Sequence, residues 1–186
     1  MQIVTLLPDQ PERIEQTARI LHEVFSRGNA QAWPTMESAR DEVQAFFAAG
    51  RVIRVAVDDA GTVLGWIGAI SDYDGHAWEL HPLVVAEAHQ KQGIGKALVQ
   101  DLEAQVRARG GGTLHLGTDD CADDGPQPSL GGVDLYPDLL AQIANIKNLR
   151  NHPYEFYQRM GFVIVGVLPD ANGFGKPDIF MAKRIA

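Results

Sequence analysis

The residues best suited to chemistry lie within residues 79–96, where an apolar run of strand length leads through a polar link to two glycines. Gly93 and Gly95 open a segment whose apolar residues recur at helical spacing. Where a strand passes through a glycine-bearing turn into a helix, backbone N–H groups converge on an anion, usually a phosphate. The stretch therefore predicts a site for a phosphate-bearing ligand.

Spacing separates three glycine-rich phosphate sites. The ATP-binding loop Gly-x-x-x-x-Gly-Lys-Ser/Thr needs a hydroxyl after its lysine, but Ala97 follows Lys96, and Gly93 lies only two residues before Gly95. The dinucleotide fingerprint Gly-x-Gly-x-x-Gly/Ala needs a small residue where Leu98 stands, and a tight turn in place of the polar link. The pattern that remains is Gln/Arg-x-x-Gly-x-Gly/Ala, which residues 90–95 match at the start of a helix.

This loop resembles the acetyl-CoA pyrophosphate loop of the GNAT superfamily of N-acetyltransferases. Further segments are similar to one branch of that superfamily, the aminoglycoside 6'-N-acetyltransferases. They are Trp-Glu-Leu-His-Pro-Leu-Val-Val (78–85), Leu-Gly-Thr-Asp-Asp (116–120), His-Pro-Tyr-Glu-Phe-Tyr (152–157), Pro-Asp-Ala-Asn-Gly (169–173) and Lys-Pro-Asp-Ile-Phe-Met (176–181). The resemblance runs from about Trp33 to the C-terminus and departs in residues 121–132, which are dense in glycine, proline and aspartate.

The resemblance implies acetyl-CoA as cosubstrate, no metal, and a cationic aminoglycoside as acceptor. It implies coenzyme contacts by His81, Leu83, Val85, Gln90, Lys91, Gln92, Gly93, Ile94, Gly95, Lys96 and Tyr157. It implies catalytic roles for Glu79 and Tyr157, and substrate contacts by Trp33, Tyr73, Glu79, Asp119 and Asp120. It also implies a homodimer.

Elementary chemistry fits the two catalytic candidates. An ammonium group must lose a proton before or during attack, so a carboxylate such as Glu79 can accept that proton directly or through water. The alternative for Glu79 is a plain surface carboxylate. Tyr157 could protonate or hydrogen-bond the departing thiolate, or it could pack in the core. Pro82 indicates a bulge or an edge in its strand, because proline interrupts a regular ladder.

Several other candidates have a structural alternative. At His81 we expect the backbone to function and the ring to pack. Asp119 and Asp120 suit a polyamine sugar or cap a turn, and we expect one of them to contact substrate. Trp33 and Tyr73 could be packing residues without the resemblance. Asp123 and Asp124 are weaker candidates, and Cys121 is not expected to be a nucleophile because no Cys–His pair is evident.

Composition bounds the class of protein. The chain has 186 residues, 45% hydrophobic and 22% charged, which predicts one globular domain over 1–186 with an irregular excursion at about 119–134. One cysteine excludes an intramolecular disulfide, and no apolar run approaches the roughly 20 residues that span a bilayer, so we expect a cytoplasmic protein without membrane association. A net charge of −8 argues against nucleic acid and is compatible with a cationic substrate.

Hydrophobic periodicity predicts an α+β fold. Strands are expected at 2–7, 51–57, 63–70, 78–85, 113–117, 162–168 and 179–185, and helices at 11–27, about 35–49, 94–109, 135–143 and 154–160. The resemblance implies the GNAT-like arrangement of these elements. That arrangement is a mixed, mainly antiparallel twisted sheet with a central parallel strand pair splayed at a bulge, and helices on both faces.

The function expected is acetyl transfer from acetyl-CoA to the 6'-amine of an aminoglycoside, by direct attack in a ternary complex, conferring antibiotic resistance. One alternative is a GNAT enzyme that acetylates another small polyamine or a peptide amine. Another is an acetyl-CoA-binding sensor without activity.

Overall fold

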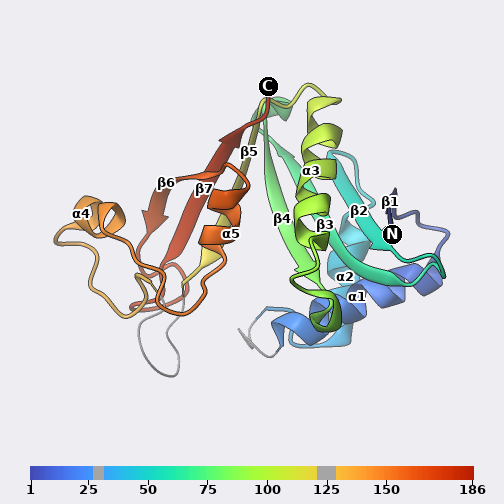
Figure 1. Ribbon diagram of the computed structural model, residues 1–186, viewed down its shortest axis with the longest axis horizontal. Helices are drawn as coiled ribbons and strands as arrows, with labels where there is room; N and C mark the ends of the chain where they lie inside the picture. The colour runs from blue at the N-terminus through green and yellow to red at the C-terminus, as the bar shows by residue number, and fades with distance from the viewer. Residues whose placement is uncertain (27–31, 121–128) are drawn as a thin grey trace. The chain divides into compact units, whose positions relative to one another are not determined.

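The chain folds around one mixed sheet, seen in a computed structural model that describes residues 1–26, 32–120 and 129–186 (Figure 1). In this part of the chain the strand order is β1-β2-β3-β4-β5-β7-β6. The strands are β1 (Gln2–Thr5), β2 (Arg51–Val57), β3 (Val63–Asp72), β4 (Ala77–Val85), β5 (Thr113–Asp119), β6 (Val163–Leu168) and β7 (Asp178–Arg184). The helices are α1 (Pro11–Phe25), α2 (Met36–Ala45), α3 (Ile94–Arg107), α4 (Leu139–Ala144) and α5 (Tyr154–Arg159), with 3₁₀ turns η1 (Tyr73–Gly75) and η2 (Glu87–His89).

The predicted fold class is confirmed. β1 to β4 pair antiparallel in sequence order, and β6 pairs antiparallel with β7. α3 connects β4 to its neighbour β5, which is the crossover that a parallel pair requires. The chain divides into two compact units, Met1–Leu114 with Ile185–Ala186 and His115–Arg184, and the division falls inside β5. The expectation of a single folding domain stays a prediction.

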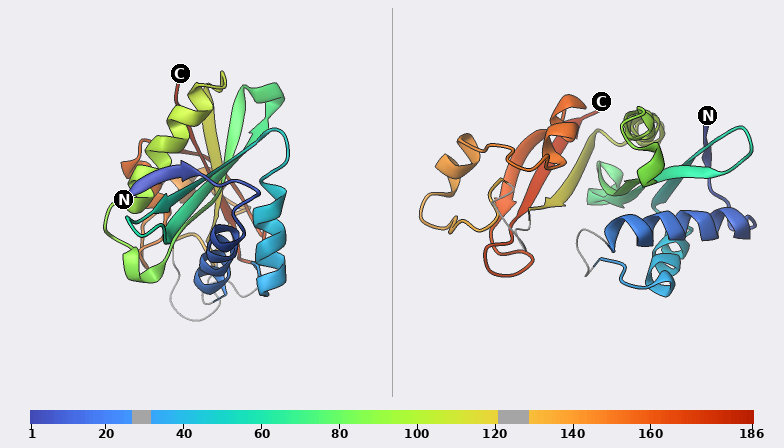
Figure 2. Two further views of the ribbon diagram at one scale, coloured as in Figure 1. Left: turned by 90° about the vertical axis from the view of Figure 1, so that its right-hand side faces the viewer. Right: turned by 60° about the horizontal axis from the view of Figure 1, so that its bottom comes forward.

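In the first unit, helices cover both faces of the β1–β4 meander. Figure 2 shows α3 on one face, with α1 and α2 together on the other. Helical spacing predicts an apolar stripe on α3 made of Ile94, Ala97, Leu98, Leu102 and Val106. All of these residues are buried except Ala97, which is half-buried. On the opposite face, apolar residues of α1 and α2 pack around the fully buried Trp66 of β3. β4 lies between these two layers and carries four of the predicted site residues, Glu79, His81, Leu83 and Val85.

α2 is shorter than the sequence predicts. It begins after Thr35, whose hydroxyl accepts the Ser38 N–H at 3.1 Å in a capping box. It ends at Ala45, because the N–H groups of Phe46, Phe47 and Ala48 bond three residues back and the chain tightens into a 3₁₀-type turn. The stop predicted for α1 at Gly28 lies outside the described residues.

In the second unit, two element boundaries differ from prediction by two residues or more. β5 runs two residues beyond the predicted end and includes Asp119. α4 was expected from residue 135 but begins at Leu139, because Pro137 disfavours helical backbone in the residue before it. Leu135 is only 2% exposed although it precedes the helix. The apolar pattern at this residue therefore indicated a buried side chain in a loop and not a helix. Most of the Gly- and Pro-rich excursion, residues 121–128, lies outside the described residues.

Candidate active site

β4 presents four predicted site residues on one half-exposed side. Burial alternates along the strand, so Glu79, His81, Leu83 and Val85 are half-buried while the residues between them are buried. This is the period-2 pattern of a strand with one face on a core. Among the residues that the structure describes, the Glu79 carboxylate has no hydrogen bond or ion pair, so its oxygens are available to a ligand.

The bulge predicted at Pro82 is present. Ile67 pairs with Leu83 and Ala69 pairs with Leu80, so His81 and Pro82 both lie opposite Gly68. A Cβ on Gly68 would overlap the His81 carbonyl oxygen and the Phe46 ring. The bulge therefore depends on a glycine in the neighbouring strand, which lets the two backbones approach closely.

The glycine loop has the geometry of an anion site. Gly93 caps α3 with φ of 86°, and Lys91 also has a positive φ, of 60°. The loop is held by its own glutamines, since Gln90 Nε2 donates to the Val85 carbonyl at 3.0 Å and Gln92 Nε2 donates to the Ala88 carbonyl at 3.1 Å. A helix leaves its first backbone N–H groups without partners inside the helix, so the N-terminus of α3 can stabilise an anion.

The charges around this helix start favour an anionic ligand. The first turn of α3 contains no acidic residue, and the exposed Lys96 lies in it. A cation at the positive end of a helix dipole is unfavourable unless an anion binds beside it. A Cβ at Gly93 would have no neighbour within 4 Å, so the turn is open on that side. Both features fit the phosphates of a coenzyme.

His81 and Trp33 lie together in the first unit, and the structure adds Glu42, which sequence reasoning missed. The His81 and Trp33 ring centroids are 5.7 Å apart. Glu42 of α2 accepts from the Trp33 indole N–H at 3.3 Å and lies 3.6 Å from His81 Nε2. No sequence signal could have identified Glu42, because a glutamate on an amphipathic helix is normally a solvated surface residue.

Tyr73 lies in the same unit, at the turn between β3 and β4. It is 72% exposed and begins η1, with a positive φ of 46°. The carboxylate of Asp72 accepts its N–H at 2.9 Å. The ring is thus free to meet a ligand, although no ring contact joins it to Trp33 or His81 among the described residues.

The two aspartates that end β5, in the second unit, have different surroundings. The exposed Asp119 accepts from Asn172 Nδ2 at 2.6 Å, and its backbone carbonyl contacts His152 Nε2 at 2.9 Å. Because the Tyr154 N–H donates to His152 Nδ1, the proton of this imidazole is on Nε2 and is donated to Asp119. The predicted Asp119 is therefore fixed in place with its side chain at the surface.

Asp120 is fully buried. Its Oδ2 accepts the N–H groups of Leu130 and Gly131, the latter at 3.1 Å, and its own N–H donates to the Pro177 carbonyl at 2.9 Å. These bonds join the residue after β5 to Leu130 and Gly131 of the predicted excursion and to Pro177, which precedes β7. Of the pair predicted for substrate, Asp119 has the accessible carboxylate and Asp120 has the surroundings of a structural residue.

Tyr157 lies on α5 in the second unit and is 9% exposed. Its ring packs edge-on against Phe156 and Phe162, with centroids 5.2 and 5.7 Å away. Burial raises the pKa of the Tyr157 hydroxyl well above its usual value. The hydroxyl is therefore protonated at neutral pH and can act as a hydrogen-bond donor.

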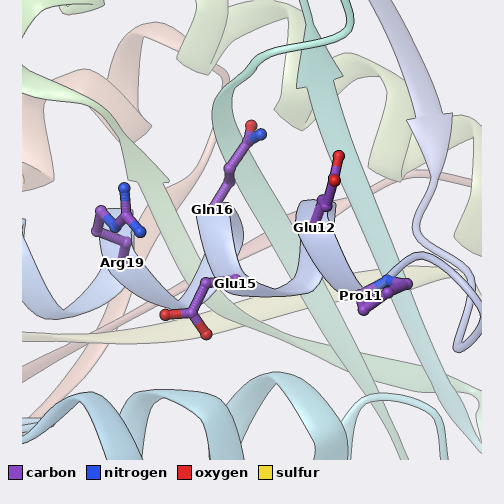
Figure 3. Close-up of a pocket in the computed structure, with 5 residues that line it drawn as sticks. All are labelled: Pro11, Glu12, Glu15, Gln16 and Arg19. Atoms are coloured by element: carbon purple, nitrogen blue, oxygen red, sulfur yellow. The ribbon is translucent and has the colours of Figure 1, made fainter.

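A hollow of about 450 Å³ lies along α1. It is lined by Pro11, Glu12, Glu15, Gln16 and Arg19, none of which is a predicted site residue (Figure 3).

In the parts of the chain that the structure describes, no three His, Cys, Asp or Glu side chains lie close enough together to hold a metal ion. None of the helices described there is long and apolar enough to cross a membrane.

Known proteins similar to the chain are acetyltransferases. The sequence model of the family described as "Acetyltransferase (GNAT) family" matches residues 15–125. No curated protein sequence matches the chain. A solved structure of an aminoglycoside 6'-N-acetyltransferase complexed with coenzyme A is 40% identical, with a TM-score of 0.88 over 100% of this chain and 98% of that one.

Two more solved structures align over the same shares of each chain. The aminoglycoside 6'-N-acetyltransferase from Enterococcus faecium is 41% identical, with a TM-score of 0.87 over 100% of this chain and 98% of that chain. An aminoglycoside 6'-acetyltransferase type Ii is 36% identical, with a TM-score of 0.74 over 100% of this chain and 98% of that chain. The matched family model, the full-length similarity and the glycine loop ahead of α3 agree, and the chain belongs to the GNAT family of acetyltransferases.

Proposed function

We propose that this protein transfers the acetyl group of acetyl-CoA to the 6'-amine of an aminoglycoside by direct attack in a ternary complex. The observation that carries the proposal is the full-length similarity, at 36 to 41% identity, to three structures named as aminoglycoside 6'-acetyltransferases. Two features support it: the Glu79 carboxylate of β4, which has no partner among the described residues, and the glycine loop that follows β4 and opens α3. The net charge of −8 favours a polycationic substrate.

The reaction needs one nucleophile and one leaving group. The substrate ammonium first gives a proton to Glu79, directly or through water, and the nitrogen lone pair then forms a bond to the thioester carbon. Backbone N–H groups at the His81–Leu83 bulge stabilise the oxyanion of the tetrahedral intermediate. The carbon–sulfur bond breaks and the sulfur leaves with the bond's electron pair. It takes up one proton as coenzyme thiol, and the nitrogen loses its second proton to become an amide.

Tyr157 is the proposed donor to the departing sulfur. Burial raises the pKa of the Tyr157 hydroxyl, so the group stays protonated at neutral pH and can donate a hydrogen bond to the sulfur. Binding both reactants in one complex supplies much of the rate, because positioning can replace a large entropic part of the barrier. Asp119, Trp33 and Tyr73 are proposed to hold the aminoglycoside, through charge and through aromatic faces that suit an amino sugar.

Release of free thiol tests the function. Acetyl-CoA with an aminoglycoside that carries a 6'-amine is expected to give one thiol per acetylated product. A matched aminoglycoside with a 6'-hydroxyl should give none. Thiol release with spermidine or a peptide amine in place of any aminoglycoside would contradict the proposal in favour of another GNAT substrate. Coenzyme binding without turnover on any amine would favour a sensor. We propose that the reaction confers antibiotic resistance, which is measured as growth of a susceptible bacterium that expresses the protein in its cytoplasm.

Gly93→Ala is expected to raise KM for acetyl-CoA about tenfold, because alanine disfavours the φ of 86° and the turn must move its N–H groups away from the pyrophosphate. Gly110→Ala is the matched control at the other end of α3. Gly110 has φ of 84°, and its Cβ would also meet nothing within 4 Å. Both variants should lose similar stability, about 1 kcal/mol, in thermal unfolding. Equal KM values in the two variants would show that Gly93 has no role in the coenzyme site.

A homodimer is the assembly we propose, supported by apolar side chains at one edge of the sheet. β6 ends the strand order, and its Val163 and Val165 are each 61% exposed. Leu168 of the same strand and Phe180 of β7 are 51% and 38% exposed. Such a patch is typical of a surface that another chain covers. Val165→Lys is expected to shift the sedimentation coefficient from dimer to monomer, and an unchanged coefficient would place any dimer contact elsewhere.

A further inference from the structure

Glu42, which has no part in the proposed chemistry, joins two predicted site residues of the first unit. Its Oε2 accepts the Trp33 indole N–H at 3.3 Å, and its Oε1 lies 3.6 Å from His81 Nε2. The side chain is 22% exposed and comes from α2, whereas Trp33 precedes that helix and His81 lies at the β4 bulge. One carboxylate thus ties three separate parts of the unit together.

Trp33 is held in a backbone conformation that few residues adopt. Its φ is 48°, in the left-handed region that favours glycine. His22 Nδ1 donates to the Trp33 carbonyl at 3.0 Å, and Phe25 packs edge-on against the indole with centroids 4.9 Å apart. Backbone strain of this kind persists where the surroundings over-determine it, and it concentrates at functional sites. Among the described residues, Glu42 is the hydrogen-bond acceptor of the indole N–H.

We propose that Glu42 is a positioning residue that sets the Trp33 ring at a defined distance from the His81–Leu83 bulge. The inference rests on the proposed function, in which Trp33 contacts the aminoglycoside and the bulge contacts the acetyl group. A fixed distance between Trp33 and the bulge keeps the amine of the aminoglycoside at a fixed distance from the thioester carbon. Glu42 acts through these neighbours and does not touch the reacting atoms.

The same carboxylate could instead attract the amine by its charge, and substitution separates the two roles. In Glu42→Gln the charge is lost, but the amide oxygen still accepts from the indole N–H, and the amide nitrogen still faces the imidazole. In Glu42→Ala the hydrogen bond to the indole N–H and the contact with the imidazole are both lost. A positioning role therefore predicts that glutamine rescues what alanine loses, whereas a charge role predicts that the two variants are equally impaired.

The kinetic test measures KM for a 6'-amino aminoglycoside, KM for acetyl-CoA and kcat. Glu42→Ala is expected to raise KM for the aminoglycoside about tenfold, which corresponds to the loss of one hydrogen bond to a charged group. Its KM for acetyl-CoA should stay within about twofold, because the glycine loop is unaltered. Glu42→Gln should stay within about threefold of the original protein in every constant, since its bonds remain.

Asp41→Ala and Asp41→Asn are the matched controls. Asp41 is the exposed neighbour of Glu42 on α2, so each control makes the same charge change without touching Trp33 or His81. A double-mutant cycle with Trp33→Phe adds a direct readout, because Glu42→Ala should have little effect once the indole N–H is gone. Equal loss in Glu42→Ala and Glu42→Gln, or no loss in Glu42→Ala, would overturn the proposal.

Acrylamide quenching of tryptophan fluorescence tests the same contact without any substrate. The chain has three tryptophans. Trp66 and Trp78 are 0% and 5% exposed, so the accessible fluorescence comes from Trp33. Quenching should increase in Glu42→Ala and not in Asp41→Ala or Glu42→Gln. Unchanged quenching in Glu42→Ala would refute the positioning role. A protein inactive on every aminoglycoside would refute the proposed function and leave this measurement valid.

Discussion

Glu79→Gln is expected to lower kcat for the aminoglycoside about 10²- to 10³-fold, within the range measured for loss of a general base. Glutamine keeps the size and hydrogen-bonding reach of the side chain but cannot accept the proton that the ammonium must lose. The affinity for acetyl-CoA should be nearly unchanged, because the residues proposed to hold its phosphates lie beyond the end of β4. Steady-state kinetics and a direct binding titration of the coenzyme measure the two quantities.

The matched control is Glu23→Gln, at an exposed position on α1, which removes one carboxylate without changing β4 and should leave kcat unaltered. Full activity of Glu79→Gln would refute the role of Glu79 as proton acceptor.

Tyr157→Phe keeps the ring between Phe156 and Phe162 but removes the hydroxyl proposed as donor to the sulfur, so it should lower kcat about tenfold. Because the pKa of this hydroxyl is raised, Tyr157 retains its proton as pH rises through the neutral range. Removing the hydroxyl should therefore leave the neutral part of the pH profile of kcat unchanged.

Gly68→Ala is expected to destabilise the protein by about 3 kcal/mol, the upper part of the range for overpacking a core. The new methyl group would overlap the His81 carbonyl and the Phe46 ring, and the obstructing atoms include backbone, which cannot rotate away. The bulge would have to shift, so kcat should fall as well. Urea denaturation measures the loss of stability through the change in midpoint.

Gly166→Ala is the matched control, because Gly166 also lies in a strand, β6, and its Cβ would meet nothing within 4 Å. Its substitution should be nearly neutral, or slightly stabilising through a less flexible unfolded chain. Equal losses in the two variants would mean that strand glycines in general, and not the close approach of β3 to the bulge, account for the effect.

Local periodicity was enough to predict most elements. α3 begins at the predicted residue and buries all of the predicted stripe except Ala97, because its apolar spacing and its flanking glycines favour the same helix. The predicted bounds of α4 and the predicted end of α2 were wrong. In α4 the apolar pattern extended across Pro137, and in α2 it extended into a 3₁₀-type turn, so burial continued where the helix did not.

The sequence by itself determined the glycine loop proposed to hold the coenzyme, since glycine spacing and the start of a helix are local properties that residues 90–96 carry together. It also predicted the bulge, because a proline inside a strand has few other uses. Only the tertiary structure separated the exposed Asp119 from the buried Asp120, because neighbours in sequence have opposite surroundings at the end of a strand. It alone joined Glu42 to Trp33 and His81. Contacts between distant residues depend on how α2 packs against β4, and no local pattern records that packing.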